Sequence, residues 1–293
     1  MPKQNILVTG ANGFIGRALM DGLDRGRFNV FALDNARISS TKIQSLKKFF
    51  LQDITQPFNI QEHFDCVFHL AALNVTHVDK AAYDAYHRVN VLGTENLIKA
   101  VKARHFVFMS TVKVYREQEG VIDEESILGP QSDYARSKLE AEHVCQKHIA
   151  GEALTILRPV NIAGYGQAEK AVIPVFFKKA LAGEPLDIIY SSQTQLQLLH
   201  IEDVLGAFDL LSKKDRGIAI VNLCPEDTIS LGELAERIRA LCKSGSGIRC
   251  SKDTEVITPK YVSRRVQAVL GWRAQRSVQD ILENYYESAA VHP

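Results

Sequence analysis

The sequence predicts a doubly wound α/β fold, with a mainly parallel sheet and a smaller C-terminal substrate-binding cap. Short apolar runs without polar alternation recur through the first half of the 293-residue chain, as in strands that are buried on both faces of a sheet. Helical stretches separate most of these runs, and such alternation implies parallel strands with right-handed crossovers. Three glycines, Gly10, Gly13 and Gly16, follow the first run where a strand would turn into a helix.

The apolar runs give the expected strands. They are residues 6–8, 30–33, 49–51, 66–70, 106–109 and 154–157, followed in the same sheet by 198–201 and 218–221. Helices are expected at about residues 14–25, 81–102, 134–148 and 203–211. The stretches 171–183 and 231–241, and the chain from about Arg249 onward, lack this rhythm. We therefore predict a dinucleotide-binding domain of residues 1–163 and 197–224, and a discontinuous cap of residues 164–196 and 225–293.

Composition favours small-molecule partners. Lys and Arg total 35 against 34 Asp and Glu, so no overall field would attract nucleic acid or an anionic membrane. The apolar stretch near the N-terminus is too brief for a signal peptide, and no apolar run approaches the ~20 residues that span a bilayer. A cytoplasmic location is expected. The five cysteines are odd in number and scattered, which predicts reduced thiols rather than a metal site or disulfides.

The glycine segment, residues 8–16, predicts a dinucleotide site. Gly10 permits a tight turn, Gly13 lets the backbone approach a pyrophosphate, and Gly16 lets the helix lie close to the strand. The phosphates would then meet free N–H groups at the positive end of that helix. For a glycine triplet taken alone, an ordinary strand-to-helix turn is the alternative.

Asp34 follows the second run, about twenty residues beyond the glycines, where a carboxylate accepts hydrogen bonds from the adenosine ribose. Because it would repel a 2′-phosphate, NAD is expected and NADP is disfavoured. Arg37 argues the other way, since a guanidinium pairs with such a phosphate, although a solvated loop charge is its commoner role. Asp53, after the third run, is expected either to face the adenine or to cap a turn.

Tyr134 and Lys138 lie four residues apart and hence on one face of a helix. A free tyrosine with a pKa of ~10 is a poor base at neutral pH, but a nearby cation favours the phenolate, and an oxidised nicotinamide would add a second positive charge. Tyr134 is therefore a candidate to move the proton of an alcohol while hydride moves at the adjacent carbon. Thr111, after the fifth run, offers a hydroxyl to the same oxygen. For this spacing alone, a surface pair is the alternative.

Together, ordered motifs along nearly the whole chain resemble the extended short-chain dehydrogenases/reductases, in particular the NAD-dependent epimerase/dehydratase family that acts on nucleotide sugars. Besides the glycines, the matching pieces are LDN at 33–35, QDI at 52–54, HLAA at 69–72, NVLGT at 90–94, MST at 109–111, VY at 114–115, YARSK at 134–138, LRPVN at 157–161, HIEDV at 200–204 and LGW at 270–272.

That resemblance implies a Rossmann fold, NAD as the cofactor and a role for each matching residue. Thr111, Tyr134 and Lys138 would form the catalytic set, and Asn90, within a helix, would steady the active-site backbone. The implied cofactor contacts are Gly10, Gly13, Phe14, Ile15, Gly16, Asp34, Asn35, Asp53, Ile54, Leu70, Ala71, Ala72, Asn90, Ser110, Tyr134, Lys138 and Pro159. The implied substrate contacts are Thr111, Val112, Lys113 and Asn161.

The chain departs from the family pattern on the substrate side. Dehydratase members have an acidic pair after the catalytic Thr, whereas Val112 and Lys113 follow it here, which disfavours 4,6-dehydratase chemistry. The family arginine that holds the nucleotide diphosphate is replaced within QLQ at 195–197, and a second arginine before the Leu-Gly-Trp motif has no counterpart. Arg116 stands where a glycine commonly follows Val-Tyr. The candidate cationic substitutes are Arg249, Lys252, Lys260 and Arg264.

The resemblance favours a nucleotide-sugar epimerase, most often a 4-epimerase in this family. A sugar-nucleotide 4-ketoreductase using NAD(P)H and a dehydrogenase of a non-nucleotide substrate are alternatives. A non-catalytic NAD-binding sensor or scaffold is a second alternative, which the intact Thr111, Tyr134 and Lys138 oppose and the missing arginines support. The family also implies a homodimer through helices 81–102 and 134–148, unless their apolar residues serve only the monomer core.

Overall fold

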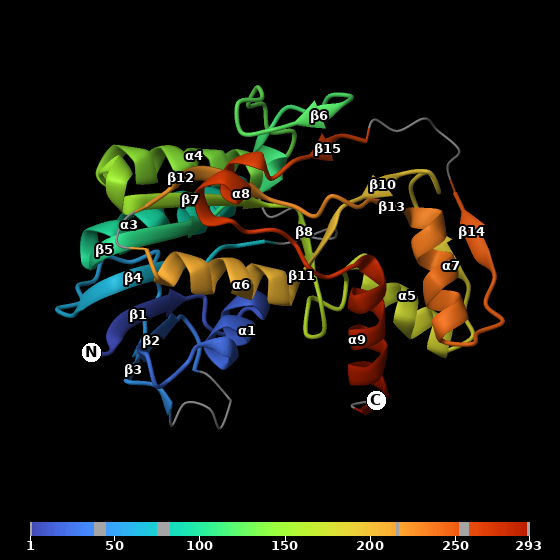
Figure 1. Ribbon diagram of the computed structural model, residues 1–293, viewed down its shortest axis with the longest axis horizontal. Helices are drawn as coiled ribbons and strands as arrows, with labels where there is room; N and C mark the ends of the chain where they lie inside the picture. The colour runs from blue at the N-terminus through green and yellow to red at the C-terminus, as the bar shows by residue number, and fades with distance from the viewer. Residues whose placement is uncertain (1, 38–44, 75–82, 215–216, 252–257, 292–293) are drawn as a thin grey trace.

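A seven-stranded parallel sheet lies at the centre of the computed structural model, which describes residues 2–37, 45–74, 83–214, 217–251 and 258–291 (Figure 1). The strand order is β12-β7-β5-β4-β1-β2-β3, so the winding direction reverses between β1 and β4. This order confirms the predicted doubly wound α/β class. The strands are β1 (Gln4–Thr9), β2 (Phe28–Asp34), β3 (Lys48–Leu51), β4 (His63–His69), β5 (Lys102–Met109), β7 (Leu154–Pro159) and β12 (Ala219–Leu223).

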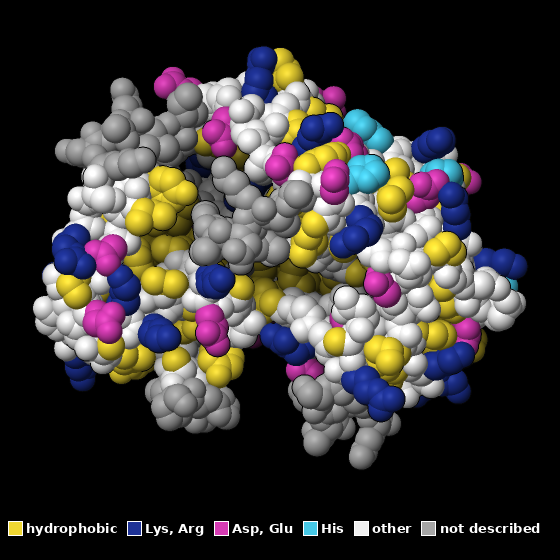
Figure 2. All heavy atoms as spheres, turned by 180° about the vertical axis from the view of Figure 1, so that it is seen from behind, with side chains coloured by type: hydrophobic (Ala, Val, Ile, Leu, Met, Phe, Trp, Pro, Cys, Tyr) yellow, Lys and Arg dark blue, Asp and Glu magenta, His cyan; other side chains and the backbone are white. Residues whose placement is uncertain are grey.

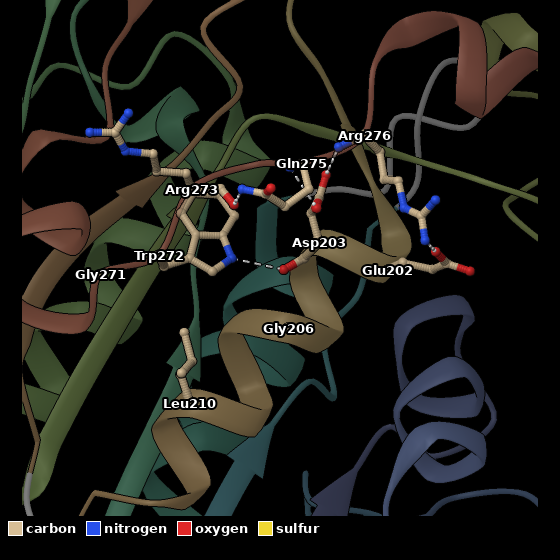
Figure 3. A pocket seen from close by; sticks show the side chains of 9 residues that line it. All are labelled: Glu202, Asp203, Gly206, Leu210, Gly271, Trp272, Arg273, Gln275 and Arg276. Atoms are coloured by element: carbon tan, nitrogen blue, oxygen red, sulfur yellow. Dashed lines mark hydrogen bonds and ion pairs between the residues drawn. The ribbon is translucent and has the colours of Figure 1, made fainter.

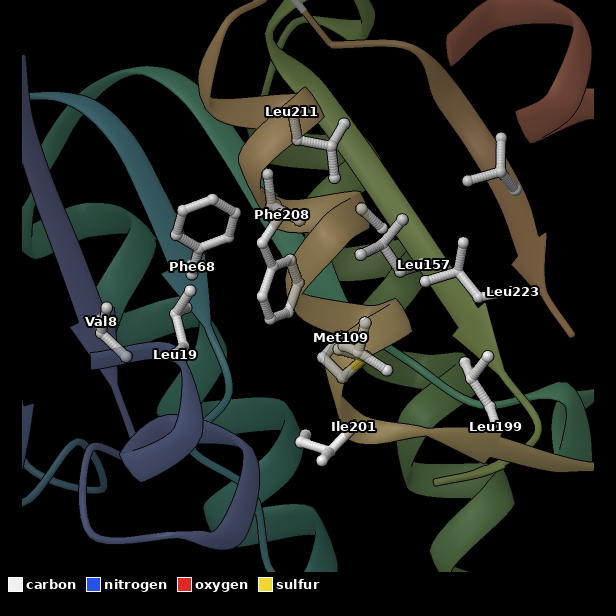
Figure 4. Packing of buried hydrophobic residues seen from close by; sticks show 14 of the residues in the cluster. Val8, Leu19, Phe68, Met109, Leu157, Leu199, Ile201, Phe208, Leu211 and Leu223 are labelled. Atoms are coloured by element: carbon white, nitrogen blue, oxygen red, sulfur yellow. The ribbon is translucent and has the colours of Figure 1, made fainter. Parts of the chain in front are cut away.

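Helices cover both faces of this sheet, which explains why its strands are apolar at consecutive positions. On one face lie α1 (Phe14–Gly22) and α6 (Ile201–Ser212), and on the other lie α3 (Gly93–Ala100) and α4 (Asp133–His148) (Figure 1). Phe68 of β4 packs toward α6, with 4.7 Å between its ring centroid and that of Phe208 (Figure 4). The neighbouring Val67 packs on the opposite face with Leu97 of α3.

A further group of buried side chains lies to one side of the sheet (Figure 1). It is built on α5 (Val172–Leu181), α7 (Leu231–Leu241), α9 (Val278–Val291) and the parallel pair β9 (Leu186–Ile188) and β14 (Ile248–Cys250). The rings of Phe177 and Tyr285 stack here with 4.8 Å between centroids. The two-domain division stays a prediction. Val266 and Trp272, which it assigns to the cap, pack in the core beneath α1 and α6.

Short pairs and turns complete the described chain. They are β6 (Val121–Ile122) with β15 (Lys260–Tyr261), β8 (Asn161–Ala163) with β11 (Leu198–His200), β10 (Gln195–Leu196) with β13 (Ile229–Ser230), the 3-10 turns Val112–Val114 and Gly151–Ala153, and α8 (Arg264–Leu270). Gly271 ends α8 with φ +67, the left-handed conformation common after a helix.

The prediction that residues 198–201 join the main sheet is wrong. Leu198–His200 pairs with β8 in a separate two-stranded sheet, and Ile201 already begins α6. β12, at the edge of the main sheet, pairs with β7. Leu198 packs in the group around α5 and α7, whereas Leu199 packs in the sheet core. The run is apolar because it contacts both cores, and not because it lies inside the sheet.

The helix expected over residues 81–102 is present as a continuous helical run over residues 83–100, but it is not a regular α-helix throughout. Residues 81–82 lie outside the described residues, and the described part is α2 (Tyr83–Tyr86), a π-helical segment (His87–Leu92) and α3, which ends at Ala100. Lys102 already belongs to β5. The helix expected over 14–25 likewise ends at Gly22. Widened π turns are frequent at functional sites, and this one carries Asn90.

The face drawn in Figure 2 carries charges of both signs, and its described residues form no large patch of either. The face drawn there is hollowed near its middle, where hydrophobic side chains are visible between charged ones. Within the described ranges, no helix has the length and apolarity to cross a membrane. None of the five cysteines forms a disulfide, and Cys66, Cys145 and Cys224 are buried.

Candidate active site

The glycine segment forms the turn between β1 and α1. Gly10 has φ +66, and a Cβ there would lie 2.7 Å from the Ala71 backbone nitrogen. A Cβ on Gly16 would lie 2.2 Å from the Gly10 carbonyl oxygen, so α1 approaches β1 this closely only because residue 16 has no side chain. Gly13 precedes α1 and has no side chain to cap the first helical N–H groups. These groups can therefore meet an anion such as a pyrophosphate.

Asp34, at the end of β2, is fixed beside this turn. Its carboxylate accepts the N–H of Asn12 at 2.9 Å and the N–H of Ala36 at 3.1 Å. A carboxylate has about four lone-pair sites, so two acceptor sites remain for ribose hydroxyls. Asn35 and Arg37 are exposed next to it.

Asp53 and Ile54 lie just after β3. The Asp53 carboxylate accepts the Thr55 N–H at 2.9 Å, which is the turn-capping role expected as one of two possibilities. The Ile54 side chain is buried in the core against Gly93, where an added Cβ would lie 2.8 Å from Ile54 Cδ1. The Ile54 side chain therefore packs β3 and the following turn against α3.

A buried histidine joins the ends of β1 and β4. Thr9 Oγ1 accepts the N–H groups of Leu70 and Ala71 at 3.2 Å each and lies 2.8 Å from His69 Nδ1. Burial, with a smaller contribution from the charge of Lys138, lowers the pKa of His69 to about 3. His69 is therefore neutral at physiological pH. The segment that the sequence assigns to the dinucleotide groove, Leu70 to Ala72, is held against the end of β1 by these bonds.

Asn90 extends this network to α4. Its Oδ1 accepts the Leu73 N–H at 2.7 Å, and its Nδ2 donates to the Leu73 carbonyl at 3.1 Å and to Ser137 Oγ at 2.9 Å. Thr94 Oγ1 lies 2.9 Å from His69 Nε2 and donates to the Asn90 carbonyl at 2.6 Å. A neutral His69 with its proton on Nε2 satisfies every donor and acceptor in the network. Because its amide is fully engaged, we assign Asn90 a positioning role rather than a cofactor contact.

Ser110 and Thr111 follow β5 directly, and both are buried. Thr111 Oγ1 accepts the N–H of Lys113 at 3.3 Å at the start of the following 3-10 turn. Val112 is only 4% exposed and packs in the sheet core, so its side chain is not available to a substrate. The side chain of Lys113 is exposed.

Tyr134 and Lys138 lie in the first two turns of α4, which contacts the turn after Thr111. Ser132 caps this helix by accepting the Ala135 N–H at 3.2 Å. The Lys138 ammonium lies 4.2 Å from the ring centroid of Phe108, near the end of β5. The helix that bears Tyr134 and Lys138 therefore packs beside the carboxyl end of β5, directly after which Thr111 stands.

Burial shifts both ionisable groups of this pair. It lowers the pKa of Lys138 to about 8, and, with a smaller effect from Tyr86, raises the pKa of Tyr134 to about 12. The Tyr134 shift is opposite to the one expected from a neighbouring cation, because burial and Tyr86 both raise the pKa and no effect of Lys138 offsets them. At neutral pH, Tyr134 in this structure is a proton donor.

A buried ion pair behind these residues was not found from the sequence. Glu142 of α4 accepts the Ser110 hydroxyl and pairs with Arg158 of β7, with 2.5 Å between Glu142 Oε2 and Arg158 Nη2. The available signal was an acidic residue four positions after Lys138, together with the arginine of the LRP motif.

Within the QLQ segment that stands in place of the family arginine, Gln197 makes structural contacts. Gln197 is buried, and its Nε2 donates to the carbonyls of Pro225 at 2.7 Å and Tyr261 at 2.9 Å. Its Oε1 accepts the Tyr261 N–H at 2.8 Å. The amide thus connects β10–β11 to β15 and has no group left for a diphosphate.

The other substrate-side residues differ in availability. Arg249 pairs with Asp187 at 2.8 Å, and Lys252 lies outside the described residues. Lys260, Arg264 and the predicted substrate contact Asn161 are exposed. In the described part of the chain, no three His, Cys, Asp or Glu side chains gather as a metal site requires.

A cavity of about 450 Å³ lies elsewhere, between α6 and the chain after α8 (Figure 3). Trp272 Nε1 donates to the Asp203 carbonyl at 3.0 Å, and the Asp203 carboxylate accepts the N–H groups of Gln275 and Arg276 at 2.9 and 3.1 Å. Arg276 pairs with Glu202 at 2.6 Å. These polar groups hold the C-terminal segment on α6, and none of the predicted cofactor or catalytic residues lines the cavity.

Several named proteins are similar to this chain in amino-acid sequence. The dTDP-D-glucose 4,6-dehydratase of Dictyostelium discoideum is 29% identical over 270 residues, which are 80% of this chain and 61% of that protein. The chain thus spans about three fifths of that relative. The uncharacterized UDP-glucose epimerase YtcB of Bacillus subtilis (strain 168) is 31% identical over 229 residues, 71% of this chain and 72% of that one.

Solved structures show the same fold along the whole chain. MoeE5 in complex with UDP-glucose and NAD has a TM-score of 0.85 at 26% identity, covering 98% of this chain and 99% of that chain. MoeE5 in complex with UDP-glucuronic acid and NAD gives the same score and identity over 99% of this chain. The model of the NAD-dependent epimerase/dehydratase family matches residues 6–224, a range that contains the glycine turn, Thr111 and the Tyr134–Lys138 helix. With the Rossmann-like sheet, this match shows that the chain belongs to the NAD-dependent epimerase/dehydratase family.

Proposed function

We propose that this protein is an NAD-dependent nucleotide-sugar oxidoreductase that acts as a 4-epimerase. The observation that carries the proposal is the packing of α4, which bears Tyr134 and Lys138, on the turn after Thr111 at the end of β5, in a chain whose glycine turn fits a dinucleotide. Relatives include both dehydratases and epimerases by name. Val112 and Lys113 stand after Thr111 where elimination of water would use an acidic pair, and this favours epimerisation.

The residues present fit NAD. In the proposed complex, the pyrophosphate lies at the N-terminus of α1, and the Asp34 carboxylate accepts hydroxyls of the adenosine ribose. Lys138 binds the nicotinamide ribose. When bound, NAD supplies a hydride acceptor that can return the hydride to the opposite face of the same carbon. Repulsion between Asp34 and a 2′-phosphate favours NAD over NADP.

Tyr134 is proposed to exchange a proton with the sugar hydroxyl, whose oxygen Thr111 Oγ1 holds by a hydrogen bond. With its pKa at about 12, Tyr134 has to lose a proton before it can act as a base. The Lys138 ammonium and the positive charge of an oxidised nicotinamide would both favour the phenolate. The protonated phenol would then be the donor when the ketone is reduced again.

The nucleotide sugar is proposed from the named ligands of MoeE5, which are UDP-glucose and UDP-glucuronic acid. Lys113 and Asn161, both exposed, are the proposed contacts of this chain to the sugar and nucleotide. We also propose a cytoplasmic homodimer that pairs α4 and the helical run of residues 83–100, on which Leu92 is 42% exposed. Light scattering checks the dimer, and a single species of 32.7 kDa would refute it.

The deciding experiment incubates the purified protein with UDP-glucose, UDP-glucuronic acid and dTDP-, GDP- and CDP-sugars, and identifies products by NMR. A 4-epimer formed without added NAD supports the proposal. Turnover only with stoichiometric cofactor indicates a reductase or dehydrogenase, and no binding or turnover across the panel counts against a nucleotide-sugar substrate. Tyr134→Phe should abolish turnover but keep NAD binding, whereas Tyr286→Phe, a matched change on α9, should keep both. Unchanged turnover in Tyr134→Phe would refute the proton-transfer role of Tyr134, whereas NAD binding without turnover of any sugar by the wild type would favour the sensor or scaffold role.

A further inference from the structure

One buried carboxylate touches both elements that carry the proposed catalytic groups. Glu142 lies on α4 one helical turn beyond Lys138, and it is only 1% exposed. Its Oε1 accepts the hydroxyl of Ser110, the residue directly before Thr111. The same carboxylate therefore contacts the strand end that bears Thr111 from the helix that bears Tyr134.

Arg158 fixes this carboxylate to a third element, β7. Its Nε donates to Glu142 Oε1 at 3.0 Å, and its Nη2 donates to Oε2 at 2.5 Å, so both oxygens are engaged in a bidentate pair. The guanidinium carbon lies 4.8 Å from the ring centroid of Tyr115, whose hydroxyl donates to Asn222 of β12 at 2.8 Å. Arg158 is thus held by contacts on two sides, and it fixes the position of the Glu142 carboxylate.

We propose that Glu142 is a positioning residue that sets the separation between Thr111 and the Tyr134–Lys138 pair by holding Ser110 and α4 on Arg158. The inference rests on the proposed function, because the separation matters only if these side chains act on one substrate oxygen. A small displacement of reacting groups is enough for a large effect, since about 1 Å of misplacement can lower a rate by about a hundredfold.

Glu142 also affects the charge of Lys138. Burial lowers the pKa of Lys138 to about 8, and the negative charge of Glu142 on the same helix opposes this shift. His69 faces Lys138 from β4 and is neutral at physiological pH. Removing the charge of Glu142 should therefore lower the pKa of Lys138 further. This change can be measured without substrate or cofactor.

A purely structural ion pair would have the same burial, so the test has to separate stability from positioning. Replacing a buried pair by apolar side chains often leaves stability unchanged or improves it. The double variant Glu142→Met with Arg158→Met should therefore unfold near the wild-type temperature. It still lacks the Ser110 contact, and its kcat should stay about tenfold or more below wild type. Recovery of kcat together with stability would overturn the proposal.

The milder variant is Ser110→Ala, which removes the hydroxyl and leaves the Glu142–Arg158 pair in place. With UDP-glucose and UDP-glucuronic acid, we expect kcat to fall about tenfold and KM to stay within about twofold. Ser212→Ala is the matched control, because this serine is equally buried and donates to the Asp209 carbonyl at 2.7 Å on α6. Equal kcat values in Ser110→Ala and the control would overturn the proposal, and this comparison decides it if the Glu142 variants do not fold.

NMR titration of ¹³C-labelled lysine, with Lys138→Met for assignment, gives a readout that does not depend on turnover. The midpoint of Lys138 should fall in Glu142→Gln and stay unchanged in the Ser212→Ala control. If the wild type converts neither nucleotide sugar, the proposed function fails, and the titration still decides the inference. An unchanged midpoint in folded Glu142→Gln would then overturn it.

Discussion

Replacing Gly16 by alanine should destabilise the protein by an amount that follows from the turn geometry. The new Cβ would lie 2.2 Å from the Gly10 carbonyl oxygen and 2.9 Å from Ala11 Cα, whereas ordinary contacts begin at 3.4 Å. Because both neighbours are backbone atoms, α1 has to move. Overpacking costs about 1–3 kcal/mol, and the better helix propensity of alanine offsets less than about 1 kcal/mol. We expect a net loss of about 2 kcal/mol.

This loss should lower the thermal unfolding midpoint by roughly 4–8 °C, measured by circular dichroism. Gly206→Ala is the matched control, since Gly206 lies inside α6 with nothing within 4 Å of an added Cβ. It should leave stability unchanged or raise it by up to about 1 kcal/mol. Gly16→Ala unfolding at the wild-type temperature would refute the close contact between α1 and β1.

Gly13→Ala separates cofactor binding from packing at the same turn. Gly13 has φ −68, and an added Cβ would meet only the Gly10 carbonyl oxygen, at 3.1 Å. We therefore expect a change in stability below about 1 kcal/mol. The methyl group would keep a pyrophosphate from the backbone, so calorimetric titration should show NAD affinity about tenfold weaker, or about 1.4 kcal/mol. Wild-type affinity in this variant would refute the proposed pyrophosphate position.

Three further changes test the buried charges. The pKa of His69 is about 3 in the folded protein, so between pH 6.5 and pH 5 only the unfolded chain takes up a proton there. The free energy of unfolding should therefore fall by about 2 kcal/mol between these two pH values. Equal free energies from urea unfolding at both pH values would contradict this. Arg158→Met leaves Glu142 buried without its partner and should lose about 3–5 kcal/mol in urea unfolding, so a loss below about 1 kcal/mol would count against a buried pair. Asp34→Asn removes the charge that repels a 2′-phosphate, so the ratio of NAD affinity to NADP affinity, measured by calorimetry, should fall about tenfold. An unchanged affinity ratio would show that Asp34 does not determine the cofactor preference.

The sheet could be predicted because burial on both faces produces a pattern that is visible within each strand's own sequence. Neighbours such as Val67 and Phe68 pack on opposite faces, so apolar residues occur consecutively and stand out without knowledge of their partners. The same pattern gave a wrong strand assignment at residues 198–201, where Leu198 and Leu199 are buried in two different cores. A local pattern shows that a run is buried, but the strand with which it pairs is determined by contacts with residues far along the chain.

The candidate site divides in the same way. Gly10, Gly16 and Asp34 were predictable because a turn, a close approach and a strand end each impose a residue type at a fixed spacing. The contacts of Glu142 were not, because Ser110 and Arg158 are 32 and 16 residues away and meet only when α4 packs on β5 and β7. The raised pKa of Tyr134 also depends on burial, which residue spacing does not reveal.

Two polar networks hold α4 on either side of Lys138. Ser137 receives a hydrogen bond from Asn90, in the network that begins at the end of β1, and Glu142 is held by Arg158. Buried networks of this kind lose much of their value if one member is removed, so the geometry around Tyr134 and Lys138 tolerates little variation. Lys113 and Asn161, by contrast, are exposed and belong to neither network. Changes in the networks should therefore lower kcat for every substrate alike, whereas changes at Lys113 or Asn161 should reorder the preference among nucleotide sugars.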